Sequence, residues 1–353
     1  MNPLLVLRER RSSLSSEDRD FLAQLLKELR KGKTKVLLTS RSEESWLPVQ
    51  SCYRLPLGGL VGEDLWEYCN AVVRDLGLTL DRSNETYATI LDKLCGNPLA
   101  IRSILLRLQS CSVRQLLADL ESSFEGREGD ESIRRLQAAY AVFGNSFTEQ
   151  YLPVLQVIGL HEYYADADHV KAMLDAAGYP VESDTINACY NILENAGFCT
   201  RIEQNVYRLH PALRGYLLRQ TPAPEPVQRG VVDIMGSLAD DLTHKPLYPI
   251  KIVYQMNIVN FYYARRLPEA QGMDVDYMAL TQSLAHHALE MRQFAEAIIL
   301  YSALAEKGES SNDWRTAANA FHQLGIVAQE CRDFVAQKFL VPFEKSVDNS
   351  RFW

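Results

Sequence analysis

Three places in the sequence combine a side chain and a position that could do chemistry, and Arg41 is the first. Arg41 follows residues 35–39, a run that is apolar on both faces, as a buried parallel strand would be. A guanidinium at the carboxyl end of a parallel strand lies where α/β sheets bind ligands, and its planar fork matches phosphate oxygens. Arg41 is therefore a candidate phosphate contact, and a solvated loop residue is the alternative interpretation.

The other two places are the pair Asn97 and Pro98 and the single residue His210. Asn97 can cap a helix, and Pro98 suits the first helical position. His210 directly precedes Pro211 at a predicted helix start, where a histidine is more often a structural hydrogen-bonding group than a ligand contact. Taken alone, these residues indicate helix ends and not a ligand site.

Other catalytic patterns are missing from the sequence. His286 and His287 are adjacent, so on a helix their side chains point about 100° apart and are poorly placed to share a metal. His161-Glu162 lacks the second histidine of a zinc protease helix, and no Gly-x-Ser-x-Gly elbow occurs. The sequence thus predicts no metal site and no nucleophile–base pair.

Composition is that of a cytoplasmic globular protein. The chain has 353 residues, and 45 acidic against 37 basic side chains give a net charge of −8. This balance disfavours nucleic acid as a partner. No apolar run is long enough to cross a membrane, and the amino end lacks the apolar core of a signal peptide. The seven cysteines are scattered without a C-x-x-C pair, which favours reduced thiols.

The elements that would position Arg41 form one βαβ unit at the amino end. Leu4–Leu7 is a predicted strand, Ser15 and Asp18 form a capping box for the next helix, and residues 35–39 are the second strand. Two strands cannot bury both faces of a sheet by themselves. We therefore expect this unit to be the trailing edge of a larger α/β domain, with a part missing upstream.

A long helical region follows and contains the other candidates. Apolar residues at helical spacing predict helices at 65–76, 87–94, 99–108, 113–120, 133–143, 151–160, 169–177 and 184–196. A predicted β-hairpin comes next, with strands at 198–202 and 206–209 around a polar turn. Helices that finish in one helix plus a short hairpin are typical of a winged-helix domain.

The carboxyl-terminal third contains a repeat. Residues 221–226 include three prolines and predict a stiff connector at a domain boundary. Beyond it, one constant offset aligns Leu284 with Leu324, Ala285 with Gly325, Ala288 with Ala328, Arg292 with Arg332 and Phe294 with Phe334. Such a period indicates stacked helix pairs.

The repeat also carries a recognisable opening. Phe321-x-x-Leu324-Gly325 matches the aromatic-x-x-Leu-Gly start of a tetratricopeptide helix pair, in which the small residue lets two helices approach closely. The usual small residue of the second helix is Ala297 in the first copy. The second copy has Gln337 there, which is a departure from the pattern.

Four motifs occur in one order along the chain, namely the strand ending in Thr39-Ser40-Arg41, the segment 95–100, Tyr207 to Pro211, and the downstream repeats. In this order they resemble the NB-ARC-type signal-transduction ATPases, the STAND class, with tetratricopeptide repeats as the sensor arm. The resemblance covers essentially the whole chain. It implies a mainly α protein with a small P-loop NTPase-like α/β remnant, a helical lid, a winged helix and a short α-solenoid.

The resemblance also implies roles for the candidate residues. In that family, the strand ending in Thr-Ser-Arg presents an arginine to the terminal phosphate, which would be Arg41. The family's Gly-x-Pro motif packs against adenine, so Pro98 and the backbone around Asn97 would line the base pocket. His210 falls where the family's Met-His-Asp motif places a histidine toward the β-phosphate of ADP, although here a proline replaces the aspartate.

Two departures from the family argue against ATP hydrolysis by this chain alone. No G-x-x-x-x-G-K-[ST] loop occurs, so nothing supplies the amides and lysine that hold the phosphates. Arg8 follows the first strand, where the family has the aspartate that organises Mg²⁺. We therefore expect no enzyme activity, no required cofactor, and at most weak ADP or ATP binding.

The sequence thus predicts a signalling or scaffold protein that acts through protein contacts of its tetratricopeptide arm. The predicted parts are the nucleotide-domain remnant 1–55, the lid 56–125, the winged helix 126–220, the connector 221–270 and the repeats 271–353. Self-association through the apolar end 339–353 is a further expectation.

The alternative prediction is a winged-helix transcription regulator. Residues 131–220 carry ten acidic and seven basic side chains, and the predicted recognition helix 184–196 contains no Lys or Arg. Since phosphate contacts need cations, this charge pattern disfavours DNA binding.

Overall fold

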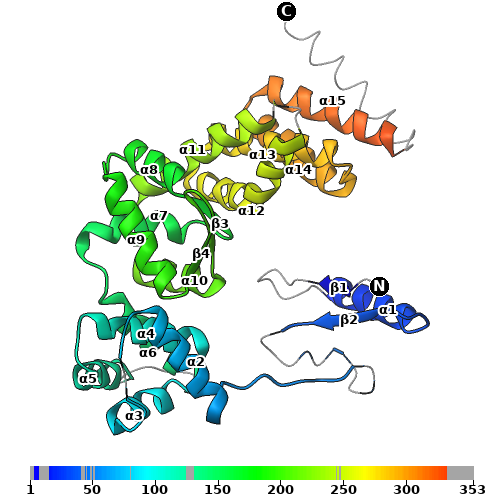
Figure 1. Ribbon diagram of the computed structural model, residues 1–353. Coiled ribbons are helices and arrows are strands. Elements are labelled where there is room, and N and C mark those ends of the chain that lie inside the picture. Colours follow the sequence, from blue (N-terminus) through cyan, green and yellow to red (C-terminus); the bar gives the residue numbers. More distant parts are fainter. Residues whose placement is uncertain are drawn as a thin grey trace, which may run out of the picture. The chain divides into compact units, whose positions relative to one another are not determined.

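The computed structural model describes residues 4–7, 16–40, 44, 46–47, 50, 52–79, 81–124, 131–243, 245 and 248–331. Over those residues the chain is mainly helical, with fifteen α-helices, a two-stranded sheet and a three-stranded sheet (Figure 1). This confirms the prediction of a mainly α protein. The chain divides into two compact units, Met1–Gly58 and Gly59–Trp353.

The first unit is the predicted βαβ unit. β1 (Leu4–Leu7) and β2 (Lys35–Leu38) pair in parallel with Leu4 opposite Lys35, and α1 (Ser16–Leu29) connects them. Parallel pairing requires a crossover connection of this kind. Arg41 belongs to this unit but lies outside the described residues.

The burial predicted for the second strand of this unit is wrong. Leu37 is 55% exposed, and Val36 and Leu38 are only half-buried. On α1, Phe21 is 72% exposed. A single helix covers only part of a two-stranded sheet, so apolar side chains on the uncovered side remain in contact with solvent.

The second unit begins with a set of packed helices. They are α2 (Gly62–Asp75), α3 (Glu85–Lys93), α4 (Pro98–Leu106), α5 (Val113–Phe124) and α6 (Glu131–Gly144), with a 3₁₀ turn at Arg107–Gln109. Asn84 and Asn97 cap α3 and α4 by accepting from backbone amides. Ile90, Ile101 and Leu116 are fully buried between the helices. The apolar spacing of the sequence therefore located these helices to within a few residues.

A sheet-bearing region follows. Its elements are a 3₁₀ turn (Glu149–Tyr151), α7 (Leu152–Gly159), β3 (Tyr164–Asp166), α8 (Ala167–Ala176), α9 (Ser183–Asn195), β4 (Cys199–Glu203), β5 (Val206–Leu209) and α10 (Pro211–Gln220). The strands are antiparallel in the order β3-β5-β4. The predicted hairpin is β4 and β5, whereas β3 was not predicted.

An aromatic cluster fills the space between α6 and the sheet-bearing region. The ring of Phe198 lies 4.8 Å from that of Phe143 and 5.1 Å from that of Tyr140, and Tyr140 meets Tyr216 edge-on at 5.6 Å. Phe143 and Phe198 are fully buried. We refer to Tyr140, Phe143, Phe198 and Tyr216 as the aromatic seam.

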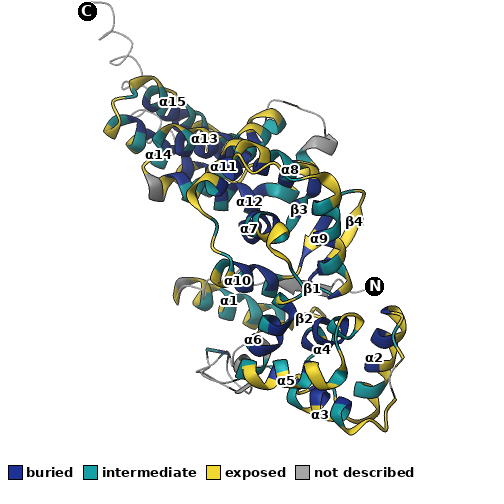
Figure 2. Cartoon of the chain, turned by 90° about the vertical axis from the view of Figure 1, so that its left-hand side faces the viewer, coloured by how far each residue is buried: buried dark blue, intermediate teal, exposed yellow. Residues whose placement is uncertain are grey.

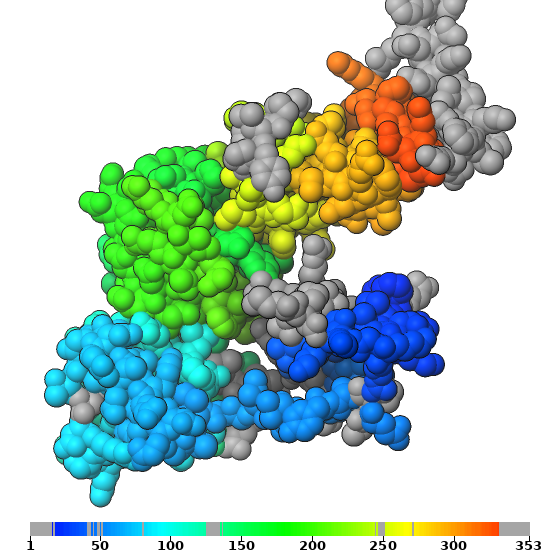
Figure 3. All heavy atoms as spheres, turned by 45° about the vertical axis from the view of Figure 1, so that its right-hand side comes forward, coloured from blue at the N-terminus to red at the C-terminus, as the bar shows by residue number. Residues whose placement is uncertain are grey.

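The remaining helices form an array of α11 (Glu225–Thr243), α12 (Tyr248–Gln271), α13 (Asp274–Glu290), α14 (Phe294–Ser310) and α15 (Trp314–Glu330). α11 begins at Glu225, inside the segment 221–226 that was predicted to be a non-helical connector, because proline is tolerated in the first turn of a helix. α11 packs on α8. A Cβ on Gly230 would lie 2.3 Å from the carbonyl oxygen of Met173, so only glycine allows this approach. The atoms of α11 and α12 lie directly against the sheet-bearing region in the space-filling view (Figure 3).

The last three helices begin at evenly spaced positions, namely Asp274, Phe294 and Trp314, so the structural period is half the offset seen in the sequence. Gly272, Arg292 and Asn312 all have positive φ, at 71°, 56° and 59°. The amide after each of them donates to a carbonyl near the end of the preceding helix, at 2.9, 2.8 and 2.8 Å. These hydrogen bonds are those of the Schellman motif, which ends a helix with one left-handed residue.

Three of the aligned repeat pairs are buried, whereas Arg292 is exposed and Phe294 is half-buried. Figure 2 shows buried residues in dark blue along the array helices. The buried pairs are Leu284 and Leu324, Ala285 and Gly325, and Ala288 and Ala328. A Cβ on Gly325 would meet no described atom within 4 Å. The close approach expected there is found instead at Gly308, where a Cβ would lie 2.8 Å from the amide nitrogen of Ala317. Arg332, Phe334, Gln337 and the apolar end 339–353 lie outside the described residues.

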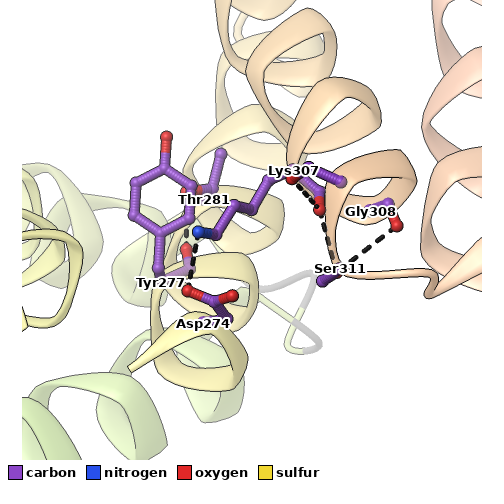
Figure 4. A network of polar contacts seen from close by, with 7 residues as sticks. Asp274, Tyr277, Thr281, Lys307, Gly308 and Ser311 are labelled. Carbon is purple, nitrogen blue, oxygen red and sulfur yellow. Dashed lines mark hydrogen bonds and ion pairs between the residues drawn. The ribbon is translucent and has the colours of Figure 1, made fainter. Parts of the chain in front are cut away.

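Polar contacts join the ends of neighbouring array helices (Figure 4). Lys307 Nζ, near the end of α14, lies 2.6 Å from Asp274 Oδ1 at the start of α13. Ser311 then donates to the carbonyl of Lys307 at 2.8 Å and closes the α14 end. Among the described helices, none has the length and apolar character needed to cross a membrane.

Candidate functional site

The structure leaves the first predicted site residue untested. Arg41 comes shortly after the end of β2 at Leu38, in a stretch outside the described residues. Its role as a phosphate contact therefore stays a prediction.

Asn97 and Pro98 lie together at the start of α4. Asn97 Oδ1 accepts from the amide of Ala100 at 3.0 Å, and Pro98 occupies the first helical turn. The carbonyl of Pro98 accepts from the Tyr68 hydroxyl of α2 at 2.8 Å, and burial raises the pKa of that hydroxyl. Because the Asn97 side chain oxygen is used by the cap, the backbone and the exposed Pro98 ring are what this turn presents outward.

A close backbone crossing holds this turn in place. The amide of Leu60 donates to the carbonyl of Gly96 at 2.8 Å. A Cβ on Gly59 would lie 1.8 Å from the carbonyl oxygen of Cys95, and one on Gly96 would lie 2.0 Å from the carbonyl oxygen of Leu60. Gly96 also has a φ of 65°. Glycine is required at both positions, so the segment before α2 and the Gly-Asn-Pro turn form one locked pair.

Arg135 of α6 supports the same turn from the other side. Its guanidinium donates to the carbonyl of Asp92 at 3.1 Å and contacts the sulfur of Cys95. Cys95 itself has a φ of 49°, an uncommon conformation for a residue with a side chain. Sequence reasoning missed Gly59, Gly96 and Arg135 in this role, and the Gly58-Gly59 pair was the available signal.

His210 caps α10. Its Nδ1 accepts from the amide of Ala212 at 3.2 Å, so this nitrogen is unprotonated in the cap. Its backbone amide donates to the carbonyl of Phe198 at 2.8 Å, which closes the start of the β4–β5 hairpin. With Pro211 in the first helical turn, histidine thus supplies the capping side chain at this helix start.

The structure connects the two described candidates through neighbouring residues. Gly197 has a φ of 80°, and a Cβ there would lie 3.4 Å from the side chain of Leu99, which follows Pro98. Arg102 Nε of the same helix donates to the carbonyl of Asn195 at 2.8 Å. The next residue after Gly197 is Phe198, the partner of His210. The starts of α4 and α10 therefore lie on adjoining elements of the second unit.

A second polar cluster, which the sequence did not indicate, lies where α12 meets β3 and α10. Arg214 Nη1 lies 3.3 Å from Glu162 Oε1, and its guanidinium stacks over the ring of Tyr263 at 4.2 Å. Asn260 is 2% exposed and bonds to the backbone on both sides of Tyr163. We refer to Glu162, Arg214, Asn260 and Tyr263 as the polar seam.

His161 lies at the edge of the polar seam and is 1% exposed. Its Nδ1 lies 2.9 Å from the carbonyl of Val157, so Nδ1 carries the proton and donates. Burial lowers the pKa of His161 to about 4, and the nearby positive charge of Arg214 acts in the same direction. His161 follows the end of α7, and it is a neutral core residue at neutral pH.

The chemistry of the whole set is that of helix caps and buried polar pairs. Within the described ranges, no three His, Cys, Asp or Glu side chains gather as a metal ion requires. No family model matches the chain, and a comparison with curated proteins finds no relative. The local geometry and the order of elements are therefore what a functional proposal has to rest on.

Proposed function

We propose that this chain is a signalling or scaffold protein of the NB-ARC/STAND type, which acts through protein contacts of α13–α15, the last three helices of the array. The observation that carries the proposal is the regular repeat of helix, left-handed turn and Schellman hydrogen bond at Gly272, Arg292 and Asn312. Helices repeated at an even spacing stack into an α-solenoid, an architecture that includes tetratricopeptide arrays and serves as a protein-binding surface.

The order of elements before the array supports the same proposal. The sheet-bearing region runs helix, strand, two helices, hairpin, with the first strand beside the last, as in a winged helix. The capped turn at Asn97 precedes it, and His210 stands at the junction of hairpin and next helix. This succession of lid, winged helix and solenoid is what the resemblance to the STAND class leads us to propose.

Nucleotide binding is proposed to be residual at most, and ATP hydrolysis by this chain alone absent. Asn97 Oδ1 and His210 Nδ1 each accept from a backbone amide and so already serve helix caps. The missing phosphate loop, and not these caps, is what limits the proposed affinity for a nucleotide. The exposed Pro98 ring and the adjoining backbone would make the weak contact with adenine.

The alternative, a winged-helix transcription regulator, is less well supported. Arg201, on the exposed hairpin strand β4, donates to Asn191 at 3.3 Å, lies 3.8 Å from Glu194 and stacks on Tyr207 at 5.2 Å. Its charge is therefore partly neutralised within the protein. Since α9 carries no Lys or Arg, the face that would approach DNA lacks the cations that phosphate contacts require.

Two measurements test the proposal. Mass spectrometry of nucleotide released from the denatured protein should find far less than one ADP per chain, and stoichiometric ADP would contradict the residual-binding part. For the scaffold part, a protein partner captured by the full chain should be lost on Asn319→Arg, an exposed position of α15, and kept in the control Glu67→Arg on α2. Equal binding by both variants would contradict a role for the array. Salt-dependent DNA binding would favour the alternative.

A further inference from the structure

The outer edge of β3 is closed by a side chain and not by a strand. β3 is an edge strand in the order β3-β5-β4. The carbonyl of Tyr163 accepts from the amide of Leu209 at 2.8 Å, so the backbone groups of Tyr164, the first residue of β3, face away from β5, while Glu162 lies in the bend just before the strand. Asn260 of α12 bonds to both residues. Its Oδ1 accepts from the Glu162 amide at 2.8 Å, and its Nδ2 donates to the Tyr164 carbonyl at 2.8 Å.

The side-chain amide of Asn260 thus holds the beginning of β3 and the bend before it, on the side of β3 that has no neighbouring strand. Figure 1 and Figure 2 both show β3 beside α12. Because Asn260 is 2% exposed, water is largely excluded from this edge, and unpaired backbone groups there would be strongly unfavourable. The stacking of Arg214 on Tyr263, almost one turn further along α12, ties the helix to the same region.

The far end of β3 sets the start of α8. Asp166, the last residue of β3, accepts with Oδ1 from the amides of Asp168 and His169 at 2.8 and 3.3 Å. This is the N-cap of α8. A strand as short as β3 has few hydrogen bonds of its own, so losing the bond at its first residue, Tyr164, together with the bond at Glu162 just before it affects its whole length.

We propose that Asn260 makes the order of β3, and with it the cap of α8, conditional on the seating of α12 against the sheet. Movement of the array away from the sheet breaks both hydrogen bonds of one side chain together. The strand edge and the first turn of α8 then loosen, while α9 and the β4–β5 hairpin keep their own pairing. The device rests on these contacts and not on the proposed nucleotide-binding ancestry.

Hydrogen exchange of the full chain, followed by mass spectrometry, tests this device. Asn260→Ala should speed exchange of residues 162–169 by about tenfold or more, since a buried hydrogen-bonded pair is lost. Asn257→Ala is the matched control, because Asn257 is a partly exposed asparagine of the same helix whose amide donates only to its own turn, at Val253. It should leave residues 162–169 unchanged, and the buried residues of α11 should be unaffected in both variants.

Tyr263→Ala tests whether seating itself matters, because it loosens α12 without changing Asn260. The same residues 162–169 should exchange faster, by a smaller factor. If Asn260→Ala fails to fold, Asn260→Asp replaces it, since the carboxylate accepts from Glu162 but cannot donate to Tyr164. Unchanged exchange at 162–169 in the Asn260 variant, an equal rise there and in α11, or no response to Tyr263→Ala would each overturn the proposal.

Discussion

The second unit is joined across two seams that differ in chemistry. The aromatic seam packs four rings between α6 and the sheet-bearing region, with Phe143 and Phe198 fully buried. The polar seam joins α12 to β3 and α10 through an ion pair, a stacked guanidinium and an amide that bonds to backbone. Both seams are largely shielded from water, yet mutations should change the stability of the two seams in different ways.

The difference follows from how each kind of contact depends on geometry. The stabilisation from ring packing is proportional to the buried apolar area and changes little with small displacements of the rings. The aromatic seam should therefore lose stability gradually as side-chain volume is removed. Buried hydrogen bonds and ion pairs depend on direction, and a partner left alone is worse than both partners being absent. The aromatic seam should therefore supply most of the stability, and the polar seam should fix the relative position of its elements.

The largest expected effect is on the aromatic seam. Phe198→Ala should lower the free energy of unfolding by about 3–5 kcal/mol, because it leaves a cavity between Phe143 and Tyr140. Urea denaturation measures the change. Tyr179→Ala, at a ring that is 40% exposed, is the control and should cost less than about 1 kcal/mol. Similar losses of unfolding free energy in Phe198→Ala and Tyr179→Ala would contradict a special contribution of the aromatic seam to stability.

The next effect concerns His161 beside the polar seam. The pKa of His161 is about 4 in the folded protein against an ordinary 6.5, so the unfolded chain binds more protons between these values. The histidine's contribution to stability is complete above pH 6.5 and is lost as the pH falls toward 4, by about 3 kcal/mol. The drop in the urea midpoint from neutral pH to the acid end of this range should be smaller in His161→Gln than in the native chain. His286→Gln, at a partly exposed histidine, should behave as the native chain does.

The polar seam itself should respond asymmetrically. Glu162→Gln leaves the nearly buried charge of Arg214 without its partner and should cost about 1–3 kcal/mol. Arg214→Met removes the charge, keeps an apolar stem against Tyr263, and should cost less. Denaturation of both variants measures the loss in the free energy of unfolding. A larger loss for Arg214→Met than for Glu162→Gln would mean that the polar seam behaves like the aromatic seam.

The smallest expected effect concerns the array turns, which lie away from both seams, and it gives a scale against which the effects at the seams can be compared. Arg292→Gly should stabilise the protein by about 0.5–1 kcal/mol, because a φ of 56° is unfavourable for arginine and ordinary for glycine. Asn312→Gly should gain less, since asparagine adopts this conformation more readily. Thermal unfolding of the two variants measures and compares these gains in stability. A loss of stability in Arg292→Gly would show that its side chain does more than occupy the turn.

Local signals in the sequence predicted most of the helices. The cap at Asn97 with Pro98 after it, and the apolar spacing of α3 to α5, placed those elements because the causes lie within a few residues. β3 was missed since so short a strand shows no alternation, and its pairing with β5 comes from residues that lie beyond two intervening helices in the chain. The two-stranded sheet was predicted correctly in topology, but Leu37 is exposed because burial depends on neighbours that no local pattern specifies.

The candidate site divides in the same way. The cap at Asn97 followed from residue type, whereas His210, which was expected only as a hydrogen-bonding residue near a helix start, turns out to be the cap of α10. The crossing of Gly59 over Cys95 and the bonds of Asn260 to Glu162 and Tyr164 join residues that are far apart in the chain. A glycine or asparagine by itself does not say which backbone it will meet. The role of Arg41 remains a prediction of the resemblance.

The matching turns at Gly272, Arg292 and Asn312 also limit how this array can change in length. The end of α14 meets the start of α13, so these successive helices run in opposite directions (Figure 1). Removing or adding a single helix with its turn therefore reverses the direction of every helix after it. Removing or adding two helices together leaves the later helices with their original direction and with the same faces turned toward their neighbours. Duplication or loss in the lineage of this protein should therefore be tolerated in helix pairs and selected against in single helices.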